Sequence, residues 1–283
     1  AFWVGQRVFP AEPPVALKPF SFDLAGMVLL AASLGAYAMS ATMGGGAFGL
    51  ANAVLADLSI VCLVAFVLVE SRTAAPLVQL QALRENALKS GLVAMALVST
   101  IVMATLVVGP FYLSGVLNLA PVQVGLVMSI GPAVSALTGL PAGRLVDRFG
   151  AFIMAILGLI GVIVGSICMT ILPGIFETIG YAVALVLITS GYALFQAANT
   201  TAVMNSTTKD HRGVTSAMLG LARNLGLITG ASVMGAVFAY GSKGTKVFGL
   251  AAGGDNGLRL TFAVAAALAG LALSAIKSGG RRK

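Results

Sequence analysis

The chain has 283 residues, of which 58% are hydrophobic and only 9% are charged, and its mean hydropathy is +1.00. Soluble domains carry about a quarter charged residues, so these charges are too few to cover a water-exposed surface of this size. The net charge of +8 is compatible with nucleic-acid binding, but the basic residues flank apolar runs, which is typical of membrane topology. We therefore expect the lipid bilayer, and no nucleic acid, as the main surroundings of the chain.

Apolar runs long enough to cross a bilayer occur eight times, and none shows the period-two alternation of a barrel strand. The predicted fold class is therefore an all-α integral membrane protein with about eight transmembrane helices. The predicted spans, in chain order, are 24–43, 53–69, 90–112, 122–142, 151–172, 179–199, 214–240 and 258–276.

The connections divide the predicted helices into parts. Residues 1–23 are expected to form a cytoplasmic segment, followed by two helices over 24–69. The polar stretch 70–89 is expected to be a cytoplasmic linker, with a short surface helix over 77–88. The remainder, 90–283, is expected to be a six-helix bundle.

The distribution of basic residues predicts the orientation. Thirteen of the 17 Lys and Arg residues fall in one set of connections, including both ends of the chain, and three fall in the opposite set. Since Lys and Arg concentrate in cytoplasmic loops, both termini are predicted to be cytoplasmic. An even number of spans agrees with this prediction.

Two features of the earlier spans have a functional and a structural interpretation. Asp57 is the one carboxylate inside an apolar run, which suggests proton coupling. Its place near the start of the second span instead favours an aspartate at an interfacial helix start. The Gly109-Pro110 step frees a backbone carbonyl and is able to kink the third span. This kink would serve gating, or simply mark the end of the helix.

The connection after the fourth span reads GRLVDRFG and covers Gly143 to Gly150. Its residues predict a tight cytoplasmic turn, with a glycine at each end and two guanidinium groups around the carboxylate of Asp147. We expect Asp147 to lie at a helix N-terminus, where free amide groups favour a negative charge. The structural alternative is a basic loop with a helix cap.

Pairs of glycines four residues apart are expected to allow close helix crossings. They occur at Gly139/Gly143, Gly161/Gly165 and Gly226/Gly230.

The later spans contain polar side chains that are costly in hydrocarbon without partners or water. Gln196 and Asn199 are three residues apart and share a helix face, so they either line a substrate cavity or make an interhelical hydrogen bond. Arg223 lies roughly 14 Å into the seventh span, beside Asn224. That depth indicates a cavity, and the alternative is a helix that starts deeper in the cytoplasm.

At GRLVDRFG the sequence resembles the major facilitator superfamily, whose cytoplasmic signature has the form G-x-L-x-D-R-x-G. The stretch 110–150 resembles the matching part of the fourteen-helix drug:proton antiporter branch. Residues 22–34 and 69–86 resemble that branch's two extra central helices and the following linker, and 211–232 resembles its penultimate helix.

The resemblance implies a secondary active transporter that exports drugs or small metabolites by alternating access in the plasma membrane, here the cell inner membrane. It implies antiport driven by the proton gradient, with no other cofactor. The conformational-switch motif would consist of Gly143, Arg144, Asp147, Arg148 and Gly150. The cavity and substrate candidates are Gln196, Asn199, Arg223 and Asn224.

The resemblance also implies an absent part. Residues 2–10 resemble the tail of a sixth helix, so we expect this chain to need an N-terminal six-helix half as its partner, together with a small-molecule substrate. In the family, the proton-coupling acid and the antiporter motif usually belong to that half.

Two other functional classes remain open. A truncated or non-transporting membrane subunit is the first alternative. A polytopic membrane enzyme is less favoured, because no span carries paired carboxylates or a nucleophile with a base. Cys62, Cys168 and the single His211 form no metal-binding or disulfide pattern, so we predict no catalytic or metal site.

Overall fold

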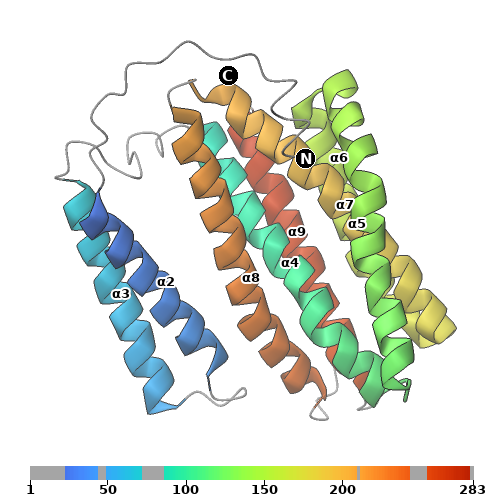
Figure 1. Cartoon of the computed structure of the whole chain (residues 1–283). Helices are drawn as coiled ribbons and strands as arrows, with labels where there is room; N and C mark the ends of the chain where they lie inside the picture. The colour runs from blue at the N-terminus through green and yellow to red at the C-terminus, as the bar shows by residue number, and fades with distance from the viewer. Residues whose placement is uncertain (1–22, 44–48, 72–85, 209–210, 243–253, 281–283) are drawn as a thin grey trace, which may run out of the picture.

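The computed structural model describes residues 23–43, 49–71, 86–208, 211–242 and 254–280. Within these ranges eight helices are long and apolar enough to cross a membrane, judged by length and composition, and no strand occurs (Figure 1). The predicted all-α fold with about eight spans is therefore confirmed.

The helices begin close to the predicted positions and most of them extend further. They are α2 (Leu24–Thr42), α3 (Leu50–Glu70), α4 (Asn86–Gly115), α5 (Pro121–Phe149), α6 (Ala151–Ile171), α7 (Pro173–Ser206), α8 (Arg212–Ser242) and α9 (Gly254–Gly280). Since α4 begins at Asn86, the last residues that we assigned to the linker belong to its first turn. The rest of the predicted surface helix, and the segment 1–22, lie outside the described residues.

A polar seam joins α2 and α3 into an antiparallel hairpin. The Ser33 hydroxyl donates to the Ser59 carbonyl at 3.0 Å, and the Ser59 hydroxyl donates to the Ser33 carbonyl at 2.9 Å. One heptad further along α2, Ser40 donates to the Asn52 carbonyl, and the Asn52 amide donates to the Ser40 carbonyl, both at 2.8 Å. Small polar residues seven apart thus let the two helices approach closely and stay paired in a medium without water.

The hairpin meets the rest of the protein along α8, which lies between the hairpin and α4 in Figure 1. Tyr37 of α2 and Thr229 of α8 share a hydrogen bond of 2.6 Å between their hydroxyl groups. α3 makes its contacts with α2, and most of its surface is exposed.

The other six helices pack around α4 and α7. α4 contacts α8 and α9 along much of its length, and α6 contacts α7 and α9. The fully buried side chains between them include Ile101, Leu159, Phe195 and Phe262. This bundle therefore has its own core, separate from the α2–α3 hairpin.

Two of the three predicted glycine crossings are confirmed. A Cβ added at Gly165 would lie 2.7 Å from the backbone nitrogen of Ile188, and one at Gly161 would lie 3.2 Å from the Cα of Gly191, so α6 and α7 touch through their backbones. A Cβ at Gly230 would lie 2.6 Å from the Thr100 carbonyl oxygen, which gives α8 and α4 the same kind of contact.

The third predicted crossing is wrong within the part of the chain that the structure describes. A Cβ at Gly139 or Gly143 would meet nothing within 4 Å. The reason is the position of α5, which contacts mainly α7 and buries only Ala142 and Val146 among its 29 residues. The sequence pattern marks a surface that permits close approach, but on α5 no described helix occupies it.

The orientation can be tested with single cysteines. In a chain whose Cys62 and Cys168 are replaced by serine, Ile175→Cys places a thiol on a 64% exposed position at the α6–α7 connection. A membrane-impermeant maleimide added to intact cells should label it, because this end is predicted to be extracytoplasmic.

Phe149→Cys is the matched control at the opposite end of the bundle, and its side chain is 49% exposed. It should react only after the membrane is opened. Labelling of Phe149→Cys alone in intact cells would reverse the orientation. The second outer position that we predict to be labelled, residue 250, lies outside the described residues.

Candidate functional site

The GRLVDRFG segment is helical for most of its length. α5 continues to Phe149, and Gly150 ends it with φ 88°, its backbone N–H donating to the Val146 carbonyl at 2.9 Å. Because that φ lies in the left-handed region, glycine is the residue best suited to this position. α6 begins one residue later, at Ala151, so the turn that we predicted over the whole segment is reduced to Gly150.

Asp147 does not lie at a helix N-terminus, and that prediction is wrong. It lies in the last turn of α5, where the helix dipole disfavours a carboxylate. The sequence reasoning failed because Gly143 continues the helix instead of breaking it, as glycine often does in membrane helices. The negative charge of Asp147 is therefore unfavourable at this location until hydrogen-bond donors from outside α5 approach it.

The guanidinium groups of the segment are exposed and do not pair with this carboxylate. Among the described residues, no Arg or Lys lies within ion-pair distance of Asp147. The Arg148 guanidinium instead lies over the Phe149 ring, 5.2 Å from its centroid, in a cation–π contact. Arg144 is exposed as well. The three charged groups are thus all available on one end of α5.

Asp147 lies on the same face of α5 as two glycines that no neighbouring side chain covers. Gly139, Gly143 and Asp147 are spaced by four residues, so they lie on one helix face. The two glycines remove side chains from that face, and nothing within 4 Å replaces them. The result is a flat helix surface that ends in an exposed carboxylate.

On α7 the structure separates the two polar candidates. Asn199 is 1% exposed, and its Nδ2 donates to the Gly91 carbonyl of α4 at 3.0 Å. This is the interhelical hydrogen bond that we gave as the structural alternative. Gln196 lies one turn earlier, is half-buried and makes no hydrogen bond to a described residue, so its amide remains available to a ligand or to water.

Substitutions should therefore affect these two residues differently. Asn199→Ala removes a buried interhelical hydrogen bond and leaves a gap, which should lower the free energy of unfolding by about 1 kcal/mol. At this chain length we expect the melting temperature to fall by roughly 2–4 °C. The measurement is thermal unfolding of the purified chain in detergent.

Gln196→Ala is the matched control on the same helix, and it should leave the melting temperature unchanged. Equal losses for both variants would mean that Gln196 is also a structural residue and not a candidate for the cavity.

On α8 both polar candidates are exposed. Arg223 lies eleven residues after the helix start at Arg212, which is roughly 17 Å along its axis, and Asn224 follows it. A cation this far along a membrane helix requires water, a lipid headgroup or a polar partner. No ion pair joins Arg223 to another described residue.

A polar cluster that sequence reasoning missed lies at the opposite end of the bundle. The Tyr112 hydroxyl of α4 donates to Asp255 Oδ1 of α9 at 3.2 Å. Arg259 and Glu177 are close enough to Tyr112 to act on it electrostatically. Asp255 and Arg259 are four residues apart at the start of an apolar run, and this spacing was the available signal.

Next to this cluster, an aromatic side chain packs against the Gly109-Pro110 step. The Tyr181 hydroxyl of α7 lies against Gly109 and donates to the Thr105 carbonyl at 3.4 Å. The Tyr181 ring stacks on Tyr112, with 6.2 Å between centroids. Gly109 is thus required for α7 to pack against α4 at this level.

Comparison with known proteins identifies the family. The family model described as Major Facilitator Superfamily matches residues 21–231. The chain belongs to the major facilitator superfamily. Its helices and this family make it a multi-pass membrane protein, and they favour a transporter over an enzyme.

A curated relative agrees with this family. "Uncharacterized transporter YebQ" of Escherichia coli (strain K12) is 32% identical to this major facilitator chain over 144 residues. The alignment covers 50% of this chain and 32% of that protein. The chain thus spans about a third of the length of the curated relative that it matches.

Proposed function

We propose that this chain works as the C-terminal half of a secondary active transporter that exports drugs or small metabolites in exchange for protons. Membership of the major facilitator superfamily and the relative named as a transporter support the transport part of this proposal. The resemblance to the drug:proton antiporter branch supports the substrate class and the coupling. The proton gradient would be the energy source.

The open face of α5 is the observation that carries the proposal. α5 is a full-length, apolar helix with two buried residues. A Cβ at Gly139 or Gly143 would meet nothing within 4 Å, and Asp147 is exposed on the same face. Glycines in a membrane helix are most useful where another helix approaches closely. A second six-helix half packed on this face would cover the glycines and bring donors to Asp147.

Alternating access follows from such a contact. While the two halves meet at this end, Asp147 would accept charge-assisted hydrogen bonds that offset its unfavourable place in the last turn of α5. When the halves separate there, the bonds are lost. The motif residues Gly143, Arg144, Asp147, Arg148 and Gly150 would in this way bias the equilibrium between two conformations.

Candidates for the substrate cavity come from the neighbouring helices. Gln196 offers an amide that no described residue uses, and Arg223 and Asn224 offer exposed polar groups on α8. Asn199 is the weakest candidate, because its amide already bonds to Gly91. Binding of a drug-like molecule would require these groups and apolar surface from both halves.

The proposal is tested by dye transport in everted membrane vesicles. Vesicles that contain the complete transporter, meaning this chain with a second six-helix half, should take up ethidium when a proton gradient is imposed. A protonophore should abolish the uptake. Vesicles with the 283-residue chain alone should show none, because its open faces lack their partner.

Three results would contradict the proposal. Uptake that persists after the protonophore would exclude proton coupling. Robust uptake by the chain alone would exclude the need for a second half and would favour a dimer of such chains. Failure of the complete transporter to move any of a panel of cationic and neutral dyes would leave the non-transporting subunit as the better description.

A further inference from the structure

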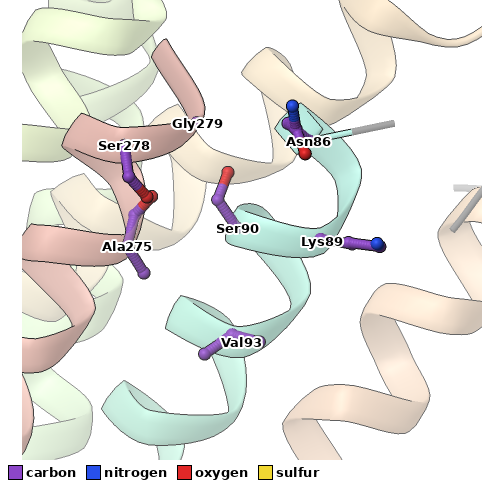
Figure 2. A pocket seen from close by; sticks show the side chains of 7 residues that line it. All are labelled: Asn86, Lys89, Ser90, Val93, Ala275, Ser278 and Gly279. Atoms are coloured by element: carbon purple, nitrogen blue, oxygen red, sulfur yellow. The ribbon is translucent and has the colours of Figure 1, made fainter. Parts of the chain in front are cut away.

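A pocket of about 330 Å³ lies between the first turns of α4 and the last turns of α9 (Figure 2). This volume is at the lower end of the range of small-ligand sites. Its rim is polar and consists of Asn86, Lys89, Ser90 and Ser278. Among the described lining residues none is acidic, so the one charge at the rim is the positive charge of Lys89.

The polarity of the pocket changes along the helix axes. Val93 lies one turn below Lys89 on the same face of α4, and Ala275 lies one turn below Ser278 and Gly279 on α9. Val93 is 50% exposed although it is apolar. The pocket therefore has a cationic, hydroxyl-bearing rim at the end of the helices and an apolar floor deeper in the membrane.

The close approach of the two helices gives the pocket its shape. Gly279 lies directly against the Ser90 side chain, and a Cβ at Gly279 would also lie 3.2 Å from the Asn86 carbonyl oxygen. A larger residue would push the end of α9 away from α4 and widen the rim. The rim is thus built by the packing of the two helix ends.

This end of the bundle also holds most of the described basic side chains. They are Lys89, Arg144, Arg148, Arg212 and Lys277, at the ends of four different helices. The lipid leaflet at such an end is the one whose anionic headgroups attract basic segments, and basic pockets between membrane helices bind those headgroups.

From these observations we infer that the pocket binds an anionic phospholipid of the surrounding bilayer. The phosphate would lie at the rim, where the Lys89 amine is able to reach it. The Ser90 and Ser278 hydroxyls, which donate to the Ala87 and Ala275 carbonyls at 3.1 and 2.9 Å, would rotate to donate to the phosphate oxygens instead. One acyl chain would run down over Val93 and Ala275. A free headgroup has no acyl chain for the apolar floor, and a lipid without net charge lacks the attraction to Lys89 at the rim. This inference does not depend on the proposed transport activity.

Native mass spectrometry of the purified 283-residue chain tests this inference. The chain in detergent is titrated with phosphatidylglycerol, with phosphatidylcholine of the same acyl chains, or with glycerol phosphate. We expect the tightest site to prefer phosphatidylglycerol. Lys89→Gln should weaken that site about fivefold, the effect of one lysine near an anionic surface. Lys89→Arg, which keeps the charge, should restore most of the affinity.

Lys277→Gln is the matched control, since Lys277 is exposed at the same end of α9 but does not line the pocket. It should leave the tightest site unchanged. Ala275→Leu fills the apolar floor and should weaken phosphatidylglycerol binding while the melting temperature stays the same.

Three outcomes would overturn the inference. Equal weakening by Lys89→Gln and Lys277→Gln would mean that the lipid responds to the overall charge of this end and not to the pocket. Equal affinity for the two lipids would remove the role of the anion. Glycerol phosphate that competes as strongly as the lipid would assign the pocket to a soluble phosphate compound.

Discussion

Gly191→Leu is expected to destabilise this protein severely, because it places a side chain where two helices touch. A Cβ at Gly191 would lie 2.7 Å from the Val162 backbone nitrogen and 2.9 Å from the Gly158 carbonyl oxygen of α6. These are backbone atoms, so the clash cannot be relieved by a rotamer change, and the helices must separate. The cost is about 3 kcal/mol or more, which corresponds to a fall in melting temperature of roughly 6–12 °C.

Gly270→Leu on α9 is the matched control. Gly270 also lies inside a membrane helix, but a Cβ there would meet nothing within 4 Å. This variant should melt at the temperature of the parent chain. Thermal unfolding in detergent, followed by the fraction of monodisperse protein, measures both. A Gly191→Leu chain that melts like the parent would show that α6 and α7 do not cross through their backbones.

Asp147→Asn is expected to have the largest effect on transport. It keeps the shape of the side chain and removes the charge that the second half would contact. Charge-assisted hydrogen bonds and dipole contacts at a partly exposed site are worth roughly 1–2 kcal/mol together. Their loss would shift the balance between the two conformations about tenfold. Transport by the complete transporter should slow about tenfold, with expression and substrate affinity nearly unchanged.

The 283-residue chain alone provides the counterpart of this experiment. Within the described residues Asp147 has no ion-pair partner, and its carboxylate lies at the unfavourable end of α5. Asp147→Asn should therefore leave the melting temperature of the chain alone unchanged or slightly higher. Asp147→Glu, which keeps the charge, should recover much of the transport. Normal turnover by Asp147→Asn would mean that the motif only ends the helix and has no role in transport. Loss of folded protein would mean that the role of Asp147 is structural.

The transmembrane helices were predictable because the physical constraint is simple. A chain that crosses hydrocarbon must satisfy its backbone within a helix, and such a helix needs about 20 apolar residues. Each of the eight predicted runs became a helix. The ends were less predictable, because polar residues such as Asn86 and Lys89 continue the α4 helix beyond the apolar run. Helix formation does not stop where hydropathy falls.

Glycine spacing predicted the capacity for a crossing and not its location. Gly161/Gly165 and Gly139/Gly143 have the same spacing, yet the first pair meets α7 and the second pair meets open space. The difference depends on how the whole bundle is arranged, which no local pattern contains. The same limit applies to α7, where Gln196 and Asn199 share a face by spacing and differ in burial.

The cluster around Tyr112 and Asp255 shows another limit. The Tyr112 hydroxyl and Asp255 are 143 residues apart in the chain and are joined by a hydrogen bond. Nothing in the apolar run around Tyr112 distinguishes it from a tyrosine that faces lipid. The Asp255–Arg259 spacing was visible, but its partner on α4 required knowledge of which helices are neighbours.

The single residue between α5 and α6 has a mechanical consequence. With Gly150 as the whole connection, there is no slack, because consecutive Cα atoms stay about 3.8 Å apart whatever the dihedral angles. A displacement of Asp147 is therefore transmitted to the start of α6, which lies only a few residues further along the chain. From there it reaches α7 through the rigid backbone contacts at Gly161 and Gly165. A displacement of this end of α5 must accordingly displace the start of α6 as well, while Gly150 leaves the angle between the two helices free to change.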